Sequence, residues 1–259
     1  MTSHHNARTT AKPRGVAWLA ILALTVTALA GCLAVDTGDT QSPDPGPTAT
    51  MEADRSERWD AELFTLDARG SNAEGLEAIE WYFAMGDGTT YEGDNLSQAQ
   101  IQHEYAHGGV YEVTFTLTDT DSAGENHTAT DTKILTVNER HPIREQTLYA
   151  APINETPTAH SSHGFDVHEN ATQWEADVFL DSVALFEESE VTIRVTDADN
   201  ETLHEQNVTV QADENETVRL FGETTGPGVY HLEILVDSGG VETSGQLRVY
   251  YAPPVGDEA

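Results

Sequence analysis

Short runs in which apolar and polar residues alternate recur along most of this chain. In the clearest run, Tyr111, Val113, Phe115 and Leu117 alternate with glutamate and threonine, which is the pattern of a strand with one buried face. Four further runs alternate in the same way, at 174–180, 191–195, 230–236 and 247–251. Glycine, aspartate and asparagine separate the runs, and no segment keeps a helical period. The pattern predicts an all-β protein built from β-sandwiches.

The alternating runs fall into two groups, separated by a polar stretch that contains prolines. We place the first unit at 57–138, a linker at 139–162, the second unit at 163–252 and a short disordered tail at 253–259. Residues 32–56 are rich in Asp, Thr, Ser, Gly and Pro, a composition typical of an extended tether. The sequence thus predicts two tandem immunoglobulin-like β-sandwich domains carried on a disordered tether.

The first 31 residues differ from the rest of the chain. Three basic residues precede a run from Val16 to Ala30 that is apolar apart from two threonines, as in a secretory signal. The sequence Leu-Ala-Gly-Cys then ends at Cys32, the only cysteine. This resembles the lipobox of prokaryotic lipoproteins, in which the cysteine is acylated and the bond before it is cut. The resemblance implies a signal peptide at 1–31 and a chain held by a lipid on Cys32 at the extracellular face of the cell membrane.

Two other interpretations of this segment stay open. A helix from about Val16 to Val35 has roughly the 20 residues needed to span a bilayer, so an uncleaved anchor also fits. Cleavage without acylation would give a secreted protein. All three interpretations export the rest of the chain, and a single acylated cysteine leaves no internal disulfide.

The charge of the chain indicates the salt conditions and the kinds of partner to expect. It carries 45 acidic and 12 basic residues, a formal net charge of −33, and Lys133 is the only lysine after the predicted signal. Repulsion between carboxylates destabilises a compact state at low salt and is screened in molar salt, where the Debye length is about 3 Å. The composition is typical of an extreme halophile, with a moderately acidic secreted protein as the alternative. Nucleic acid, another polyanion, is not expected as a partner.

Five motifs of the first unit occur in the order of a known family. They are Leu66-Asp67-Ala68-Arg69-Gly70-Ser71, Gly86-Asp87-Gly88, His103-Glu104-Tyr105, Gly109-Val110-Tyr111-Glu112-Val113-Thr114 and Thr118-Asp119. This order resembles the PKD domain, an immunoglobulin-like module of bacterial and archaeal surface proteins. The resemblance implies structural roles for Phe83, Gly86, Asp87, Gly88, His103, Tyr105, Gly109, Tyr111 and Asp119.

The chain departs from the family pattern just before the Gly-Asp-Gly turn. Phe83-Ala84-Met85 stands where Trp-Asp-Phe is usual, so we expect Trp81 to fill the core instead. The two glycines of the turn permit positive φ, with Asp87 bonding local backbone amides. We expect Tyr111 to bury its ring and to hydrogen-bond the neighbouring loop.

The second unit carries a weaker resemblance. Residues 165–172, followed by strands and a Gly-Pro-Gly-Val-Tyr corner at 226–230, resemble the β-sandwich modules appended to secreted peptidases. A generic immunoglobulin-like sandwich is the alternative.

Seven asparagines stand in Asn-x-Ser/Thr form and are plausible glycan acceptors on an exported chain. A composition rich in threonine and asparagine also produces such triplets by chance. We favour Asn170, Asn200 and Asn215, whose surroundings resemble loops. The full set is Asn95, Asn126, Asn154, Asn170, Asn200, Asn207 and Asn215.

Two groups of side chains raise the question of a metal. His160, His163 and His168 lie close together in sequence, but without a motif such as His-Glu-x-x-His we expect solvated linker histidines and no metal site. We expect His103 to be a structural residue with its polar groups satisfied. Alternating oxygen ligands at 119–121 and 197–200 suit calcium, but strand-end turns explain them equally well.

The chain contains no Gly-x-Ser-x-Gly, no cysteine–histidine pair, no Walker loop and no glycine-rich dinucleotide turn. We therefore expect no enzyme activity and no cofactor. The expected function is non-catalytic binding of a surface protein or polysaccharide. Trp59 and Tyr91 are candidate aromatic anchors, although we favour core packing as the role of either. The alternatives are a glycosylated structural spacer of the envelope and an accessory subunit of a secreted hydrolase or transporter.

Overall fold

The computed structural model describes residues 46–73, 78–121, 124–150, 159–183 and 188–253, which belong to one compact unit spanning Pro43–Ala259. The predicted signal sequence, Cys32 and Asn154 lie outside these residues. Within the described ranges, a short 3-10 helix, η1 (Leu96–Gln98), is the only helix, and none is long and apolar enough to cross a bilayer. The rest consists of strands and their connections, which confirms the predicted all-β class.

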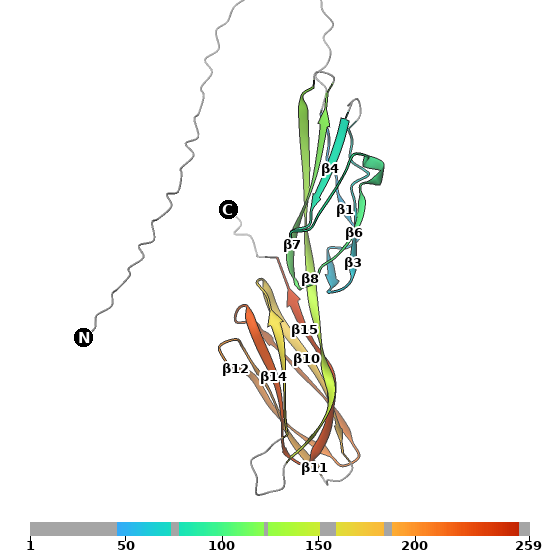
Figure 1. Ribbon diagram of the computed structural model, residues 1–259. Helices are drawn as coiled ribbons and strands as arrows, with labels where there is room; N and C mark the ends of the chain where they lie inside the picture. The colour runs from blue at the N-terminus through green and yellow to red at the C-terminus, as the bar shows by residue number, and fades with distance from the viewer. Residues whose placement is uncertain (1–45, 74–77, 122–123, 151–158, 184–187, 254–259) are drawn as a thin grey trace, which may run out of the picture. The chain divides into compact units, whose positions relative to one another are not determined.

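The first sandwich packs two layers around an aromatic core (Figure 1). The sheet β1-β3-β6 forms one layer, the β8-β7-β4-β5 part of an eight-stranded sheet forms the other, and β2 pairs in parallel with β8. Val113, Phe115 and Leu117 of β7 are fully buried, as their alternation predicts. The strands are β1 (Glu52–Ala53), β2 (Glu57–Trp59), β3 (Leu63–Asp67), β4 (Ala78–Ala84), β5 (Thr90–Gly93), β6 (Gln100–Glu104), β7 (Gly109–Thr120) and β8 (Asn126–Tyr149).

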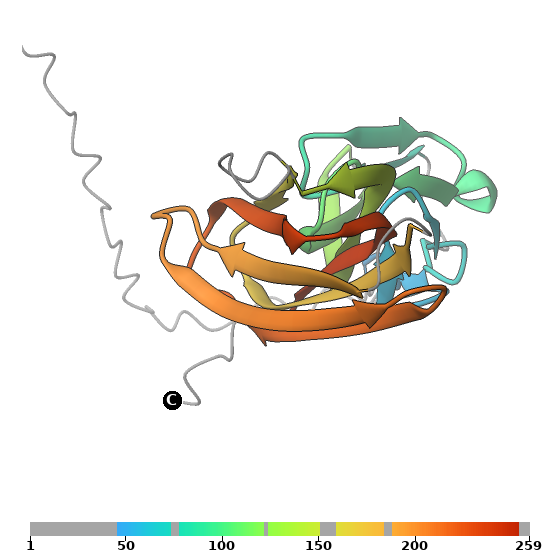
Figure 2. The same cartoon turned by 90° about the horizontal axis from the view of Figure 1, so that it is seen from below.

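The second sandwich stacks the sheet β12-β11-β14-β9 on the β13-β10-β15-β8 part of the eight-stranded sheet (Figure 2). Its core contains the residues whose alternation marked these strands, among them Trp174, Ile193 and Tyr230. The strands are β9 (His160–Val167), β10 (Ala171–Ser182), β11 (Glu188–Thr196), β12 (Thr202–Gln211), β13 (Asn215–Glu223), β14 (Gly228–Ser238) and β15 (Gly240–Tyr251).

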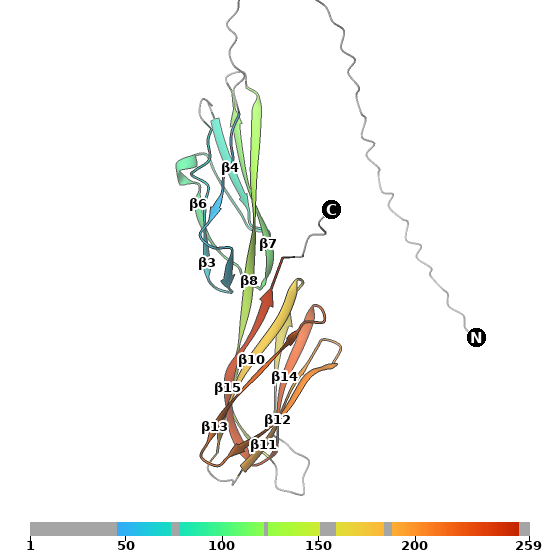
Figure 3. The same cartoon turned by 180° about the vertical axis from the view of Figure 1, so that it is seen from behind.

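The two sandwiches share β8, which is 24 residues long (Figure 3). Its first half, 126–137, pairs with β7 of the first sandwich. From Glu139 onward it pairs with β15 of the second sandwich. A single hydrogen-bonded strand therefore runs through both sandwiches and joins their layers into one eight-stranded sheet.

Two buried polar residues lie where β8 changes partner. The Asn138 side chain accepts a hydrogen bond from the backbone N–H of Tyr251 at 3.0 Å. The Glu139 carboxylate accepts from the Gly108 backbone N–H at 2.6 Å and from the Tyr251 hydroxyl at 2.9 Å. Burial alone would raise the pKa of Glu139, but its hydrogen bonds and the nearby His168 hold it below the usual value. These contacts give hydrogen-bond partners to the backbone N–H just before β7 and to the N–H and hydroxyl groups of the last residue of β15.

The predicted linker at 139–162 is wrong for 139–149, which form the second half of β8, and for 160–162, which begin β9. Only Glu139, Ile143 and Leu148 are buried in 139–149, and a register shift opposite 243–245 interrupts their alternation, so the sequence looks polar and irregular. The predicted tether is wrong for 46–56, where Met51 is 1% exposed and β1 pairs with β3. The first sandwich thus begins before residue 57, and the second includes residues before 163.

Each sandwich packs a tryptophan over a glycine on the adjacent strand. Trp81 lies opposite Gly93, and Trp174 lies opposite Gly222. A Cβ at Gly222 would lie 2.8 Å from the Trp174 ring, and one at Gly93 would also meet the Trp81 ring. Both glycines are required by packing, because each leaves room for an indole.

We expect Gly93→Ala and Gly222→Ala each to lower the free energy of unfolding by about 1–3 kcal/mol, since the added methyl forces an indole out of its position. Thermal unfolding in molar salt measures the change. Gly70→Ala is the matched control, because a Cβ there meets nothing within 4 Å. Unchanged stability in both tryptophan-facing variants would contradict the packing argument.

Candidate functional site

The residues of the PKD-like turn have structural roles. Gly86 has φ +84°, and a Cβ there would lie 2.8 Å from the carbonyl oxygen of Glu112. Asp87 accepts a hydrogen bond from the Thr89 backbone N–H at 2.8 Å, and its other oxygen lies 2.9 Å from Nε2 of His103. Burial alone would raise the pKa of Asp87, but these two contacts lower it. The bond to a local amide is confirmed.

His103 is buried and has both ring nitrogens engaged. Its Nε2 faces Asp87, and its Nδ1 lies 3.1 Å from the Tyr91 hydroxyl. The expectation of a satisfied structural histidine is confirmed. Tyr91 packs against the core of the first sandwich, so it is not a free aromatic anchor.

Two tyrosines occupy equivalent corners. Tyr111 and Tyr230 both follow Gly-Val, and each hydroxyl donates to the carbonyl four residues upstream, His107 at 2.8 Å and Gly226 at 2.9 Å. This is the geometry of a tyrosine corner. The Tyr111 ring stacks on Tyr105 with centroids 3.9 Å apart. The predicted hydrogen bond of Tyr111 is confirmed, whereas the residue is half-buried and its ring is not fully enclosed. The same hydrogen bond recurs at Tyr230 in the second sandwich.

The other PKD-like residues lie in or beside the core. Trp81 is buried, which confirms that it fills the core, and Phe83 is buried beside it. The hydroxyl of the buried Tyr105 donates a hydrogen bond to the backbone carbonyl oxygen of Met85 at 2.8 Å. Gly109 has φ +156° at the start of β7, and Asp119 is buried in that strand.

The candidate glycan acceptors within the described residues are all exposed. Asn170 and Asn200 adopt positive φ in turns, and Asn215 begins β13. The exposed set is Asn95, Asn126, Asn170, Asn200, Asn207 and Asn215. Attachment of a glycan at any of them stays a prediction.

The carboxylates of Asp121 and Asp197, from the two groups that suit calcium, accept hydrogen bonds from backbone N–H groups of turns. Oδ1 of Asp197 accepts hydrogen bonds from the backbone N–H groups of Asp199 and Glu201, at 3.0 and 2.9 Å. In Asp121, Oδ1 accepts the N–H of Glu125 at 2.8 Å. The strand-end interpretation therefore accounts for both groups.

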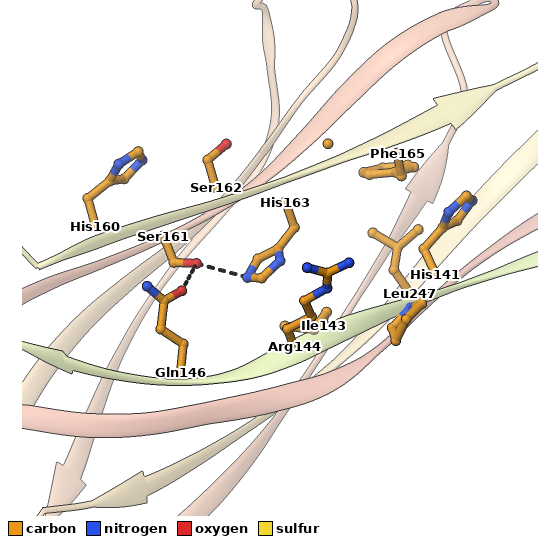
Figure 4. Close-up of a pocket in the computed structure, with 12 residues that line it drawn as sticks. His141, Ile143, Arg144, Gln146, His160, Ser161, Ser162, His163, Phe165 and Leu247 are labelled. Carbon is orange, nitrogen blue, oxygen red and sulfur yellow. Dashed lines mark hydrogen bonds between the residues drawn. The ribbon is translucent and has the colours of Figure 1, made fainter.

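The three clustered histidines are separated in space. His160 and His163 lie on β9, beside a groove of about 560 Å³ between β9 and β8 (Figure 4). His168 follows β9 and lies near Glu139. Figure 4 shows Ser161 and His163 pointing into the groove and His160 pointing to the other side of β9. The three do not form one site.

Ser161 in this groove makes a hydrogen bond of the wrong polarity for a nucleophile. Its hydroxyl lies 2.8 Å from Oε1 of Gln146 and 2.9 Å from Nε2 of His163. Since Oε1 only accepts, the hydroxyl proton goes to Gln146, and His163 must donate. A general base needs the opposite arrangement, with the imidazole accepting the proton.

A second surface has the features of a binding face. Arg140, Arg248, Glu175 and Phe221 form one row across β8, β15, β10 and β13, according to the strand register. We call the outward side of these four strands the outer face. Phe221 is 71% exposed there and borders a cavity of about 460 Å³ that Glu175 and Glu223 also line.

Charged pairs lie in the middle of the outer face. Asp177 accepts from Arg219 and Arg248, both at 2.8 Å, and Glu175 accepts from the Tyr250 hydroxyl at 3.0 Å. The hydrogen bond from Arg219 is the main cause of a lowered pKa for Asp177. The face therefore presents fixed donors and acceptors side by side.

Trp59 extends the outer face from the first sandwich. Its ring meets Tyr250 edge-on with centroids 5.5 Å apart, and the Arg140 guanidinium lies 4.7 Å from its centroid. The sequence pattern indicated Trp59 as a candidate anchor but not Tyr250 or Phe221. Phe221 is an apolar residue at a solvent-facing position of β13, and this was its only signal in the sequence.

The comparisons agree with the motif order of the first unit. Residues 44–135 match the PKD domain family. A search of curated proteins finds no match. The first PKD domains of the Vibrio cholerae metalloprotease PrtV and of Vibrio anguillarum Epp are 22% and 24% identical, cover 35% and 36% of this chain and 98% and 95% of their own, and give TM-scores of 0.25. A carbohydrate-binding module from the β-sandwich superfamily is 14% identical over 80% of this chain and 96% of its own, with a TM-score of 0.29.

We expect Arg144→Gln to raise the pKa of His163. Burial and then the charge of Arg144 lower this pKa below the ordinary value of 6.5, and the substitution removes the second cause. In the folded protein His163 thus resists protonation, so its contribution to stability falls as the pH drops below the unfolded pKa. NMR titration of the His163 ring measures the shift. Arg69→Gln in the first sandwich should leave it unmoved, and an unchanged or lower pKa in Arg144→Gln would contradict the assignment.

Proposed function

We propose that this protein is a lipid-anchored extracellular surface protein whose sandwiches form a non-catalytic binding module for polysaccharide. The signal-like segment and Cys32 support export and anchoring. The outer face is the observation that carries the binding proposal. There, Trp59, Tyr250 and Phe221 lie among paired carboxylates and guanidinium groups.

The chemistry of the outer face suits sugars. A pyranose offers apolar C–H faces that stack on aromatic rings, and hydroxyl groups that both donate and accept hydrogen bonds. The face supplies rings of Phe221 and Tyr250, acceptors on Glu175 and Glu223, and the donors of Arg219 and Arg248. Glu175, Arg219 and Arg248 are already held by their ion pairs, so little of their side-chain freedom is lost on binding.

The absence of an activated nucleophile in the groove supports a non-catalytic role. Within the described residues, Ser161 and His163 form a Ser–His pair in a groove. The hydroxyl of Ser161 donates its hydrogen bond to Gln146 and not to His163. Carboxylate pairs are abundant in a chain of net charge −33 and do not by themselves indicate hydrolysis.

A second candidate is a glycosylated spacer of the envelope. It is favoured by the exposure of every Asn-x-Ser/Thr asparagine in the described ranges. A spacer needs no ligand at the outer face, so a binding experiment separates the two proposals.

We expect Phe221→Ala to weaken polysaccharide binding about 10-fold or more, because an exposed aromatic anchor contributes most of the contact. Calorimetry against a panel of soluble neutral glucans, mannans and xylans in molar salt measures the affinity. The control is Tyr82→Ala, which removes a 40% exposed tyrosine of the first sandwich. Binding of no polysaccharide, or equal binding by both variants, would overturn the assignment.

We expect Cys32→Ser to release the protein from membranes, since the thiol is the only attachment point for a diacylglyceryl group. Membrane fractionation and intact mass spectrometry of the native protein measure this. A wild-type chain that begins at Met1, or carries no lipid mass, would refute the anchor.

A further inference from the structure

Three metal-ligating side chains come together where β8 passes between the sandwiches. His107 lies in the turn between β6 and β7, Glu139 lies on β8, and His168 follows β9. One ligand atom from each lies within 4.8 Å of the other two. They come from parts of the sequence that show no shared motif.

The spacing of these atoms suits a bound ion better than a hydrogen bond. Nε2 of His168 lies 3.5 Å from Oε1 of Glu139, beyond the usual hydrogen-bond length. A tetrahedral ion with bonds of about 2.0–2.2 Å holds its ligand atoms roughly 3.3–3.6 Å apart. The same Nε2 is buried and has no hydrogen-bond partner among the described residues. The imidazole thus directs an unused ligand atom at a carboxylate.

The surrounding residues already hold the carboxylate in place. Gly108 donates to one oxygen of Glu139 and Tyr251 donates to the other. Such outer contacts orient the ligands of metal sites. His141 lies beside them, with Nε2 3.6 Å from Oε2 of Glu139. Glu139 is 4% exposed, so its position is fixed by burial as well.

We propose that His107, Glu139 and His168 bind one zinc ion, with water completing a tetrahedral shell. Two imidazoles and one carboxylate are a known zinc donor set, whereas calcium and magnesium prefer oxygen ligands. The ion would connect the β6–β7 turn of the first sandwich to the end of β9 in the second, and so fix the crossing. This site is independent of the proposed polysaccharide binding.

The test is titration of the chelator-treated, full-length protein with zinc chloride in molar salt containing excess magnesium, which occupies nonspecific carboxylates. Calorimetry should give one equivalent of zinc, and added zinc should raise the unfolding temperature. Substitution by cobalt should give the visible absorption of a tetrahedral site.

His107→Gln and His168→Gln are the informative variants, because these side chains are partly or fully exposed and their loss leaves the crossing intact. Each should weaken zinc binding about 10-fold or more and abolish the thermal shift. His127→Gln is the control, since His127 belongs to a separate cluster with Asp121 and Glu125. No stoichiometric zinc binding, or equal binding by wild type and both variants, would overturn the proposal, as would loss of binding in His127→Gln alone.

Discussion

The join between the sandwiches depends on the hydrogen bonds that the buried carboxylate of Glu139 accepts from both of them. The carboxylate satisfies the Gly108 backbone N–H just before β7 and the hydroxyl of Tyr251 at the end of β15. Asn138 completes the crossing by accepting from the backbone of Tyr251 and donating to Glu57 at 2.6 Å. Each buried group left without its partner costs about 1–3 kcal/mol. The two residues therefore allow one strand to pass from the first sandwich to the second within one sheet while the polar groups at the crossing keep their hydrogen bonds.

A shared strand has consequences for the surface as well as for stability. The outer face needs Trp59 from the first sandwich beside Tyr250 from the second, and their edge-on contact exists only while β8 stays continuous. Paired carboxylates and guanidinium groups occupy the same face in a strongly acidic chain. Their pairing neutralises the charge at the place where aromatic rings are presented, so a neutral ligand that covers this face desolvates fewer unpaired charges there than elsewhere.

Local patterns predicted most of the fold. Alternation marked the buried faces of β7, β10, β11, β14 and β15, and the order of glycines, aspartates and tyrosines marked the PKD-like turn and both tyrosine corners. The second half of β8 escaped prediction because its buried positions are few and a register shift breaks their period. The outer face and the His107–Glu139–His168 cluster could not be predicted, since each depends on the register between strands distant in sequence. Closeness in sequence was misleading here. His160 and His163 lie beside a groove on β9, and His168 does not line that groove.

The central claim is that β8 forms one uninterrupted strand through both sandwiches. Amide hydrogen exchange of residues 136–140, measured in molar salt, tests it most directly. The account predicts protection at the crossing comparable to that of Val113 and Val178, which lie on central strands of the two sandwiches. Rapid exchange at 136–140, with Val113 and Val178 still protected, would show two independent domains joined by a flexible linker and would contradict the account.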